Sequence, residues 1–164
     1  LQEEKKVLIM DQGGNYHLAV ASSFADAKKL HIACAKSAAI ALLTRTPAGV
    51  LYPDLLKQSF TVDCDDWLRK YFDETKPELK KMRQIAEIRK LQILDQGNGR
   101  YVAHIKVYLT RACEYQGITF VETAEALLTF AMAENPDIST NGRLPLVTYQ
   151  ILRCDIRKTG EKQQ

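Results

Sequence analysis

Residues 101–110 read Tyr-Val-Ala-His-Ile-Lys-Val-Tyr-Leu-Thr, and this stretch decides the fold class. Its odd-numbered positions, from Tyr101 to Leu109, are apolar, whereas polar residues such as His104 and Lys106 lie at even positions. Such alternation is typical of a half-buried β-strand. The stretch therefore predicts a strand with one face on a core and the other toward solvent.

Extended segments lie on both sides of this strand. Residues 88–94 also alternate, and the turn residues 95–99 join them to it. After a turn at 114–117, residues 118–133 form another extended segment. Part of that segment, 122–132, has a composition that could form a helix, but the short turn and the flanking strands favour a strand.

The chain closes with a loop and a last strand. Asn-Pro and Asn-Gly dipeptides place the loop at 134–143, and the strand follows at 144–156, with Val147, Tyr149 and Ile151 on one face. The second half of the chain is therefore predicted to be a meander of about four long strands.

The first half is predicted to be mainly helical after a hairpin formed by residues 7–11 and 16–21. Residues 24–45 contain no Gly or Pro and carry apolar residues at helical spacing, so they predict one long helix. A second helix is expected to begin at Asp63, and a third at Lys76-Pro77. Helices followed by strands predict an α+β fold with an antiparallel sheet rather than a parallel one.

The composition of the 164 residues bounds the function. We expect a charged lead-in at 1–6, a single α+β domain at 7–157 and a flexible tail at 158–164. A hydrophobic content of 46% suits one packed core, and a net charge of +3 gives no indication of nucleic-acid binding. No apolar run approaches the roughly 18–20 residues that cross a bilayer.

The cysteines and histidines do not form a metal-binding pattern. Cys34, Cys64, Cys113 and Cys154 include no CxxC pair, so no metal or cofactor is expected. The four cysteines allow three disulfide pairings, and the sequence alone does not choose between them. They can equally be small buried free cysteines. In an oxidising compartment Cys113 and Cys154 are the best candidates for a bridge, because both lie in predicted strands.

No phosphate-binding loop or nucleophile elbow is present, and no catalytic chemistry is visible in the residues. If the chain were an enzyme, the acid/base residues would be His104, Asp155 or Glu122, facing the inside of a curved sheet. For each of the three, a structural or surface role is the preferred interpretation.

Three segments carry a resemblance to a known family. They are the opening hairpin at 7–14 with the residues 23–31 into which it leads (Ser-Phe-Ala-Asp-Ala-Lys-Lys-Leu-His), the acidic helix at 65–72, and residues 141–149 (Asn-Gly-Arg-Leu-Pro-Leu-Val-Thr-Tyr). A long helix, two shorter ones and a strongly bent sheet is the order of cone-shaped folds like that of nuclear transport factor two. Within that fold, the chain resembles the periplasmic domain of the bitopic inner-membrane subunit of type IV secretion and conjugation systems, the VirB-type assembly factor and its TraK-like relatives.

The resemblance implies a structural role in the periplasm. Such proteins are not enzymes; they oligomerise and contact other subunits of the secretion channel. They are anchored in the inner membrane by one helix, here expected in a segment absent from this chain, and the start at Leu1 is compatible with that.

The family often has an Asn-Pro-x-Gly-like turn before its final strand. Here its elements are split between Asn135-Pro136 and Asn141-Gly142. The candidate protein-interface residues are Asn135, Pro136, Asn141, Gly142 and Leu144.

The alternative function is a cone-fold small-molecule binder or enzyme, similar to an isomerase or dehydratase, with a pocket in the concave face of the sheet. An enzyme should leave that face open around a titratable group. An assembly subunit should fill it with side chains and expose an apolar patch elsewhere.

Overall fold

The alternating stretch at 101–110 lies within a longer strand, one of four that form an antiparallel meander. The computed structural model describes residues 5–10, 12–21 and 23–159. The elements in chain order are β1 (Lys5–Met10), β2 (Tyr16–Ala21), η1 (Phe24–Asp26), α1 (Lys28–Leu43), β3 (Arg45–Thr46), β4 (Gly49–Val50), α2 (Pro53–Ser59), η2 (Val62–Cys64), α3 (Asp65–Leu79), β5 (Arg83–Gly97), β6 (Arg100–Tyr115), β7 (Ile118–Glu134), α4 (Ile138–Asn141) and β8 (Leu146–Lys158).

The predicted α+β class and antiparallel sheet are confirmed. The main sheet has the order β4-β3-β5-β6-β7-β8, and every neighbouring pair is antiparallel. The expected number of about four strands is wrong, because the sheet has 6. The two missed strands, β3 and β4, have two residues each, too few to show an alternation in sequence.

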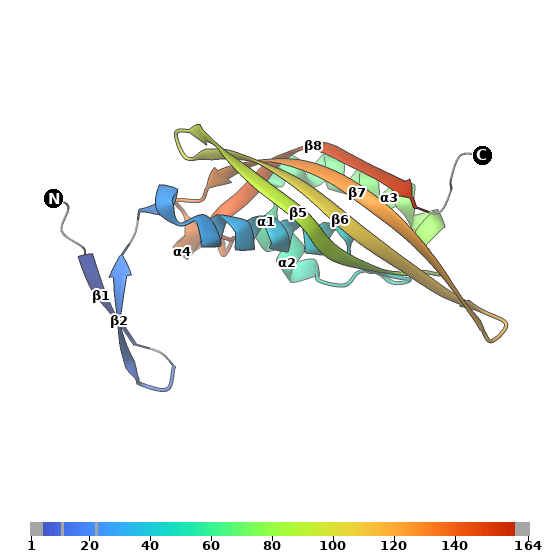
Figure 1. Ribbon diagram of the computed structural model, residues 1–164, viewed down its shortest axis with the longest axis horizontal. Helices are drawn as coiled ribbons and strands as arrows, with labels where there is room; N and C mark the ends of the chain where they lie inside the picture. The colour runs from blue at the N-terminus through green and yellow to red at the C-terminus, as the bar shows by residue number, and fades with distance from the viewer. Residues whose placement is uncertain (1–4, 11, 22, 160–164) are drawn as a thin grey trace.

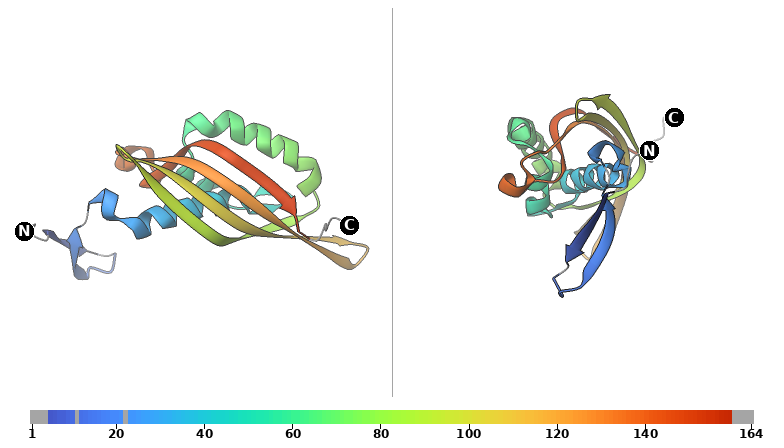
Figure 2. Two further views of the ribbon diagram at one scale, coloured as in Figure 1. Left: turned by 45° about the horizontal axis from the view of Figure 1, so that its top comes forward. Right: turned by 90° about the vertical axis from the view of Figure 1, so that its left-hand side faces the viewer.

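The sheet curls into a half-barrel around α1 (Figure 1, Figure 2). Bulges contribute to the curl, because an extra residue bends a strand and increases its local twist. On β5 the pairing passes over Arg89, and on β8 it passes over Tyr149 and Leu152. The β8 bulges also break the predicted alternation of Val147, Tyr149 and Ile151.

Helix α1 lies in the hollow of the sheet, and α2 and α3 cover the open side (Figure 2). Small side chains on α1 let its backbone approach the strands: Ala35, Ala38 and Ala39 are fully buried. They pack in the same core as Leu128 and Phe130 of β7. The concave face is therefore occupied by close-packed side chains.

Three helix predictions need correction. The helix expected from Asp63 begins at Asp65, and Asp63 itself lies in the 3₁₀ turn η2. Helix α1 runs only from Lys28 to Leu43, since a separate 3₁₀ turn precedes it and Arg45 already belongs to β3. No separate helix begins at Lys76-Pro77, because α3 continues to Leu79. Pro77 is tolerated there because it lies in the last turn, where the missing N–H removes one hydrogen bond near the helix end.

The ends of the chain differ from the central sheet. Strands β1 and β2 confirm the predicted hairpin, pair only with each other and lie away from the half-barrel (Figure 1). Strand β1 begins at Lys5, inside the expected lead-in, and β8 reaches Lys158. The rest of the expected tail, from residue 160 on, lies outside the described residues.

Candidate protein interface

The loop between β7 and β8 brings together the candidate interface residues. The amides of Asn135 and Asn141 pair reciprocally: each Nδ2 donates to the other Oδ1, at 3.0 Å from Asn135 and 2.9 Å from Asn141. Nδ2 of Asn135 also donates to the carbonyl oxygen of Leu144 at 3.1 Å. The Asn-Pro and Asn-Gly elements, split in sequence, are therefore adjacent in space.

The same two asparagines fix the backbone of the loop. Oδ1 of Asn135 accepts from the N–H of Asp137, and Oδ1 of Asn141 accepts from the N–H of Arg143. Gly142 ends α4 in the left-handed region, with φ of 66°, which favours glycine. Because both amides are used inside the loop, Asn135 and Asn141 position its surface rather than offer free hydrogen-bonding groups.

A shallow groove of about 350 Å³ adjoins this loop. The guanidinium of Arg100 lies 5.0 Å from the ring centroid of Tyr149 along it, and Nε of Arg143 donates to the carbonyl oxygen of Phe60 at 3.2 Å. Thr61, Asp63 and Asn135 also line the groove. Its lining combines polar and apolar side chains, and Pro136 is among them.

The residues considered for catalysis do not form a site. His104 is exposed on the outer face of the sheet, where its Nδ1 lies 3.2 Å from Oγ1 of Thr129. Asp155 is exposed on the same face and accepts from Nε of Arg153 at 2.7 Å. The expectation that these two side chains face the inside of the sheet is wrong, and only Glu122 shares the inner face. His104 and Asp155 occupy the strand positions that alternate with the core residues, so their side chains point away from the core.

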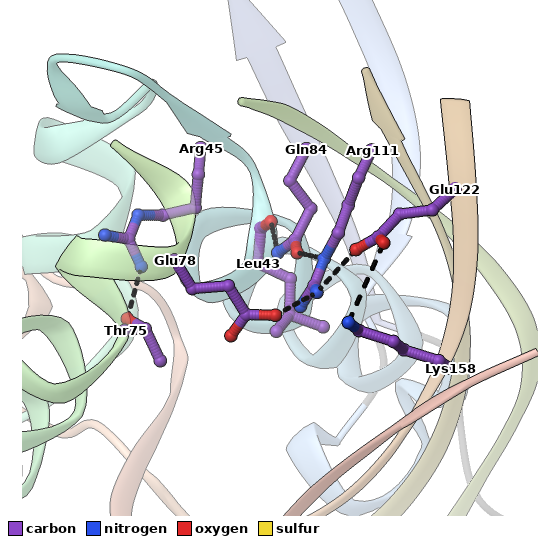
Figure 3. A network of polar contacts seen from close by, with 8 residues as sticks. All are labelled: Leu43, Arg45, Thr75, Glu78, Gln84, Arg111, Glu122 and Lys158. Carbon is purple, nitrogen blue, oxygen red and sulfur yellow. Dashed lines mark hydrogen bonds and ion pairs between the residues drawn. The ribbon is translucent and has the colours of Figure 1, made fainter. Parts of the chain in front are cut away.

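Glu122 belongs to a buried polar cluster centred on Arg111 at one end of the concave face (Figure 3). Nη1 of Arg111 lies 2.7 Å from Oε1 of Glu78 and 3.1 Å from Oε1 of Glu122. Its Nε donates to Oε1 of Gln84 at 2.7 Å, and Nε2 of Gln84 donates to the carbonyl oxygen of Leu43 at 2.6 Å. Arg111 is 4% exposed and Gln84 is fully buried.

This cluster fastens distant parts of the chain together. Glu78 comes from α3 and Leu43 from the end of α1, whereas Gln84, Arg111 and Glu122 come from neighbouring strands. Lys158 of β8 completes the cluster, with its Nζ 3.8 Å from Oε2 of Glu122. A buried arginine held by two carboxylates and an amide stabilises this arrangement, because loss of Arg111 leaves the buried amide oxygen of Gln84 without its donor.

The sequence reasoning missed this cluster, although a signal was present. The inward positions on β6 are odd-numbered from Tyr101 to Leu109, and Arg111 is the next odd position. An arginine that continues an apolar face predicts an internal partner. The partners themselves lie 27 and 33 residues away in the sequence, at Gln84 and Glu78.

All four cysteines are free, and Cys113 and Cys154, the candidates for a bridge in an oxidising compartment, are not paired. Cys154 pairs with Leu128, which in turn pairs with Ile105 of β6. Cys113 lies eight residues further along β6, opposite Phe120, so the two cysteines are far apart in the sheet. Burial is the main cause that raises the pKa of Cys154 to about 11. Its thiol is therefore neutral at ordinary pH and unreactive.

The inner face of the sheet continues beyond the core onto a two-stranded ribbon, residues 113–121. Here β6 and β7 pair only with each other, because pairing with β5 ends at Ala112 and pairing of β7 with β8 ends at Ala124. A two-residue turn, Gln116-Gly117, with positive φ at both positions, closes the ribbon. The ribbon projects past the helices (Figure 1).

One face of this ribbon is apolar and uncovered. Cys113 pairs with Phe120, and Tyr115 pairs with Ile118. All four side chains lie on the same face of the sheet as Arg111 and Glu122, which is the inner face. Tyr115 and Ile118 are each 59% exposed and Phe120 is 51% exposed. Contiguous exposed apolar side chains of this kind mark interaction surfaces.

Comparisons with known proteins add no assignment: no family model, curated protein or solved structure matches the chain. Within the part of the chain that the structure describes, no helix is long and apolar enough to cross a membrane. The same residues contain no cluster of three or more His, Cys, Asp or Glu side chains suited to a metal ion.

Proposed function

We propose that this domain is an assembly subunit that acts through protein–protein contacts, as in the apparatus of type IV secretion or conjugative transfer. One observation carries the proposal: the inner face of the sheet is filled by α1 where a reaction chamber would be expected, and the same face continues uncovered onto the 113–121 ribbon. This arrangement favours assembly over the alternative of a small-molecule binder or enzyme with its pocket in the concave face.

The fold supports the comparison with this class of subunit. Helices followed by a curled antiparallel sheet are what a nuclear transport factor two-like cone requires. The proposal includes a periplasmic location, anchoring in the inner membrane through a segment outside this chain, and contacts with other channel subunits. The Asn135–Asn141 loop and its groove are a second surface for such contacts.

The ribbon is proposed to pack against the ribbon of a second copy. Its apolar face carries no charged side chain at Cys113, Tyr115, Ile118 and Phe120, so two identical faces meet without repulsion. A two-fold contact uses the same patch on both copies, and this patch suits such a self-complementary interface.

A pair of matched substitutions tests this contact. Phe120→Glu places a charge on the apolar face, whereas Val121→Glu places the same charge on the opposite face of the same strand, where the side chain is 62% exposed. Phe120→Glu is expected to weaken self-association at least tenfold, since an unpaired charge buried at a contact costs more than about 1.4 kcal/mol. Sedimentation equilibrium measures the dissociation constant of each variant.

Val121→Glu should self-associate like the unmodified protein. Cys113 provides an independent measurement, because a short bismaleimide should link two copies through it, whereas Cys34 and Cys64 are buried. Cys113→Ser should abolish the linked dimer. A monomeric protein, or equal association of the two glutamate variants, would contradict the proposed contact.

A further inference from the structure

A hollow in the surface lies between the β3–β4 hairpin and α3. Its volume is about 330 Å³. Residues 46–50 form one wall, and one face of α3 forms the other, with Phe72 and Leu79 as its apolar part. Lys76 and Lys80 line the hollow from the same helix, and Asp73 is the one carboxylate in its lining. The lining therefore combines apolar surface with an excess of positive charge.

Arg45, which also lines the hollow, is a buried cation without an anionic partner among the described residues. It is 4% exposed. Its Nη1 donates to Oγ1 of Thr75 at 3.0 Å, and its guanidinium lies 4.9 Å from the ring centroid of Phe72. Its Nε has no hydrogen-bond partner. Burial lowers the pKa of Arg45, but a guanidinium stays charged in a protein, so the charge remains uncompensated.

The carboxylate of Glu78, also on α3, is paired with another cation. Glu78 pairs with Arg111 at 2.7 Å, although Figure 3 shows Arg45 and Glu78 in the same region. Neither Lys76 nor Lys80 forms an ion pair within the described ranges, whereas Lys70, earlier on α3, lies 3.9 Å from Glu74. Three cations thus converge on the hollow against a single carboxylate.

We propose that this hollow binds a small organic anion, with its phosphate or carboxylate group near Arg45, Lys76 and Lys80 and its apolar part against Phe72 and Leu79. An anion here compensates the charge of the buried guanidinium, and the apolar wall favours a ligand that carries an apolar group beside its charged group. This site is separate from the ribbon and from the loop at Asn135, and it does not depend on the proposed assembly role.

Titration calorimetry with phenyl phosphate tests the site. The double variant Lys76→Ala/Lys80→Ala should weaken binding at least tenfold, because it removes two charge-assisted contacts to the anion. Lys70→Ala removes the same charge from the same helix outside the hollow and should change the dissociation constant by less than about twofold. Asp73→Asn should tighten binding, since it removes the opposing carboxylate.

The separate parts of phenyl phosphate distinguish the two walls. Inorganic phosphate and phenol should each bind more weakly than the joined molecule, and phenyl phosphate should shift the backbone amide resonances of Thr46 and of residues 48–50. Circular dichroism of the lysine variants checks that they remain folded, which is expected because α3 keeps its apolar face. Absence of binding, or equal loss with Lys70→Ala and the double variant, would overturn the proposal.

Discussion

Two arginines at the same end of the half-barrel are equally buried but differ in what surrounds them. Arg111 and Arg45 are both 4% exposed. Two carboxylates and the amide of Gln84 hold Arg111, whereas Arg45 has only a hydroxyl and an aromatic ring. The difference teaches that burial of a charge alone does not reveal its role: Arg111 completes the fold, and Arg45 retains bonding capacity that the fold leaves unused.

The largest effect is expected from Arg111→Met. The substitution keeps much of the buried volume but leaves Gln84 without its partner and separates Glu78 and Glu122 from their shared cation. We expect a loss of about 3 kcal/mol in the free energy of unfolding, at the lower end for a broken buried pair because both carboxylates can reach water.

Urea unfolding measures this loss, and Arg153→Met is the matched control. Arg153 also pairs with a carboxylate at 2.7 Å, but both side chains are about half exposed, so its loss should cost less than about 1 kcal/mol. Similar losses for the two variants would show that the Arg111 cluster does not fasten the fold.

A smaller effect is expected from Gln84→Met, which removes the amide and leaves the charged residues of the cluster in place. This variant leaves the carbonyl of Leu43 without its donor and Nε of Arg111 without its acceptor, inside a fully buried site. The expected loss is about 2 kcal/mol, measured in the same unfolding experiment. A loss below about 0.5 kcal/mol would mean that water replaces the amide.

The smallest effect is expected from Arg45→Met, although this residue is buried as deeply as Arg111. Loss of the Thr75 hydrogen bond and of the contact with the Phe72 ring is offset by removal of an uncompensated buried charge. The free energy of unfolding should stay within about 1 kcal/mol of the starting value. A destabilisation as large as that of Arg111→Met would remove the distinction between the two arginines.

The sequence predicts the strands of this fold better than its helices and its polar contacts. The meander follows from alternation and from turn residues such as 95–99, which are local signals. The end of α3 was misplaced because Pro77 usually begins a helix, and here it lies within the last turn. The face assigned to Tyr149 was wrong, because a bulge on β8 shifts the alternation and depends on the partner strand.

The candidate sites divide in the same way. The pairing of Asn135 with Asn141 lies within one loop, and the sequence placed both residues in it. Arg111 and Glu78 are 33 residues apart, and the sequence around either residue does not predict the other as its partner. The hollow at Arg45 arises from packing a hairpin against a helix, so its lining follows only from the tertiary structure.

The reciprocal amide pair in the β7–β8 loop has a consequence for the ageing of the protein. Asn141 precedes Gly142, and asparagine is chemically labile, so hydrolysis of this amide to a carboxylate is a natural route of damage. The new oxygen would face the Oδ1 atom of Asn135, to which Nδ2 of Asn141 now donates at 2.9 Å. Deamidation at this one position would replace an attraction by a repulsion and unlock the loop.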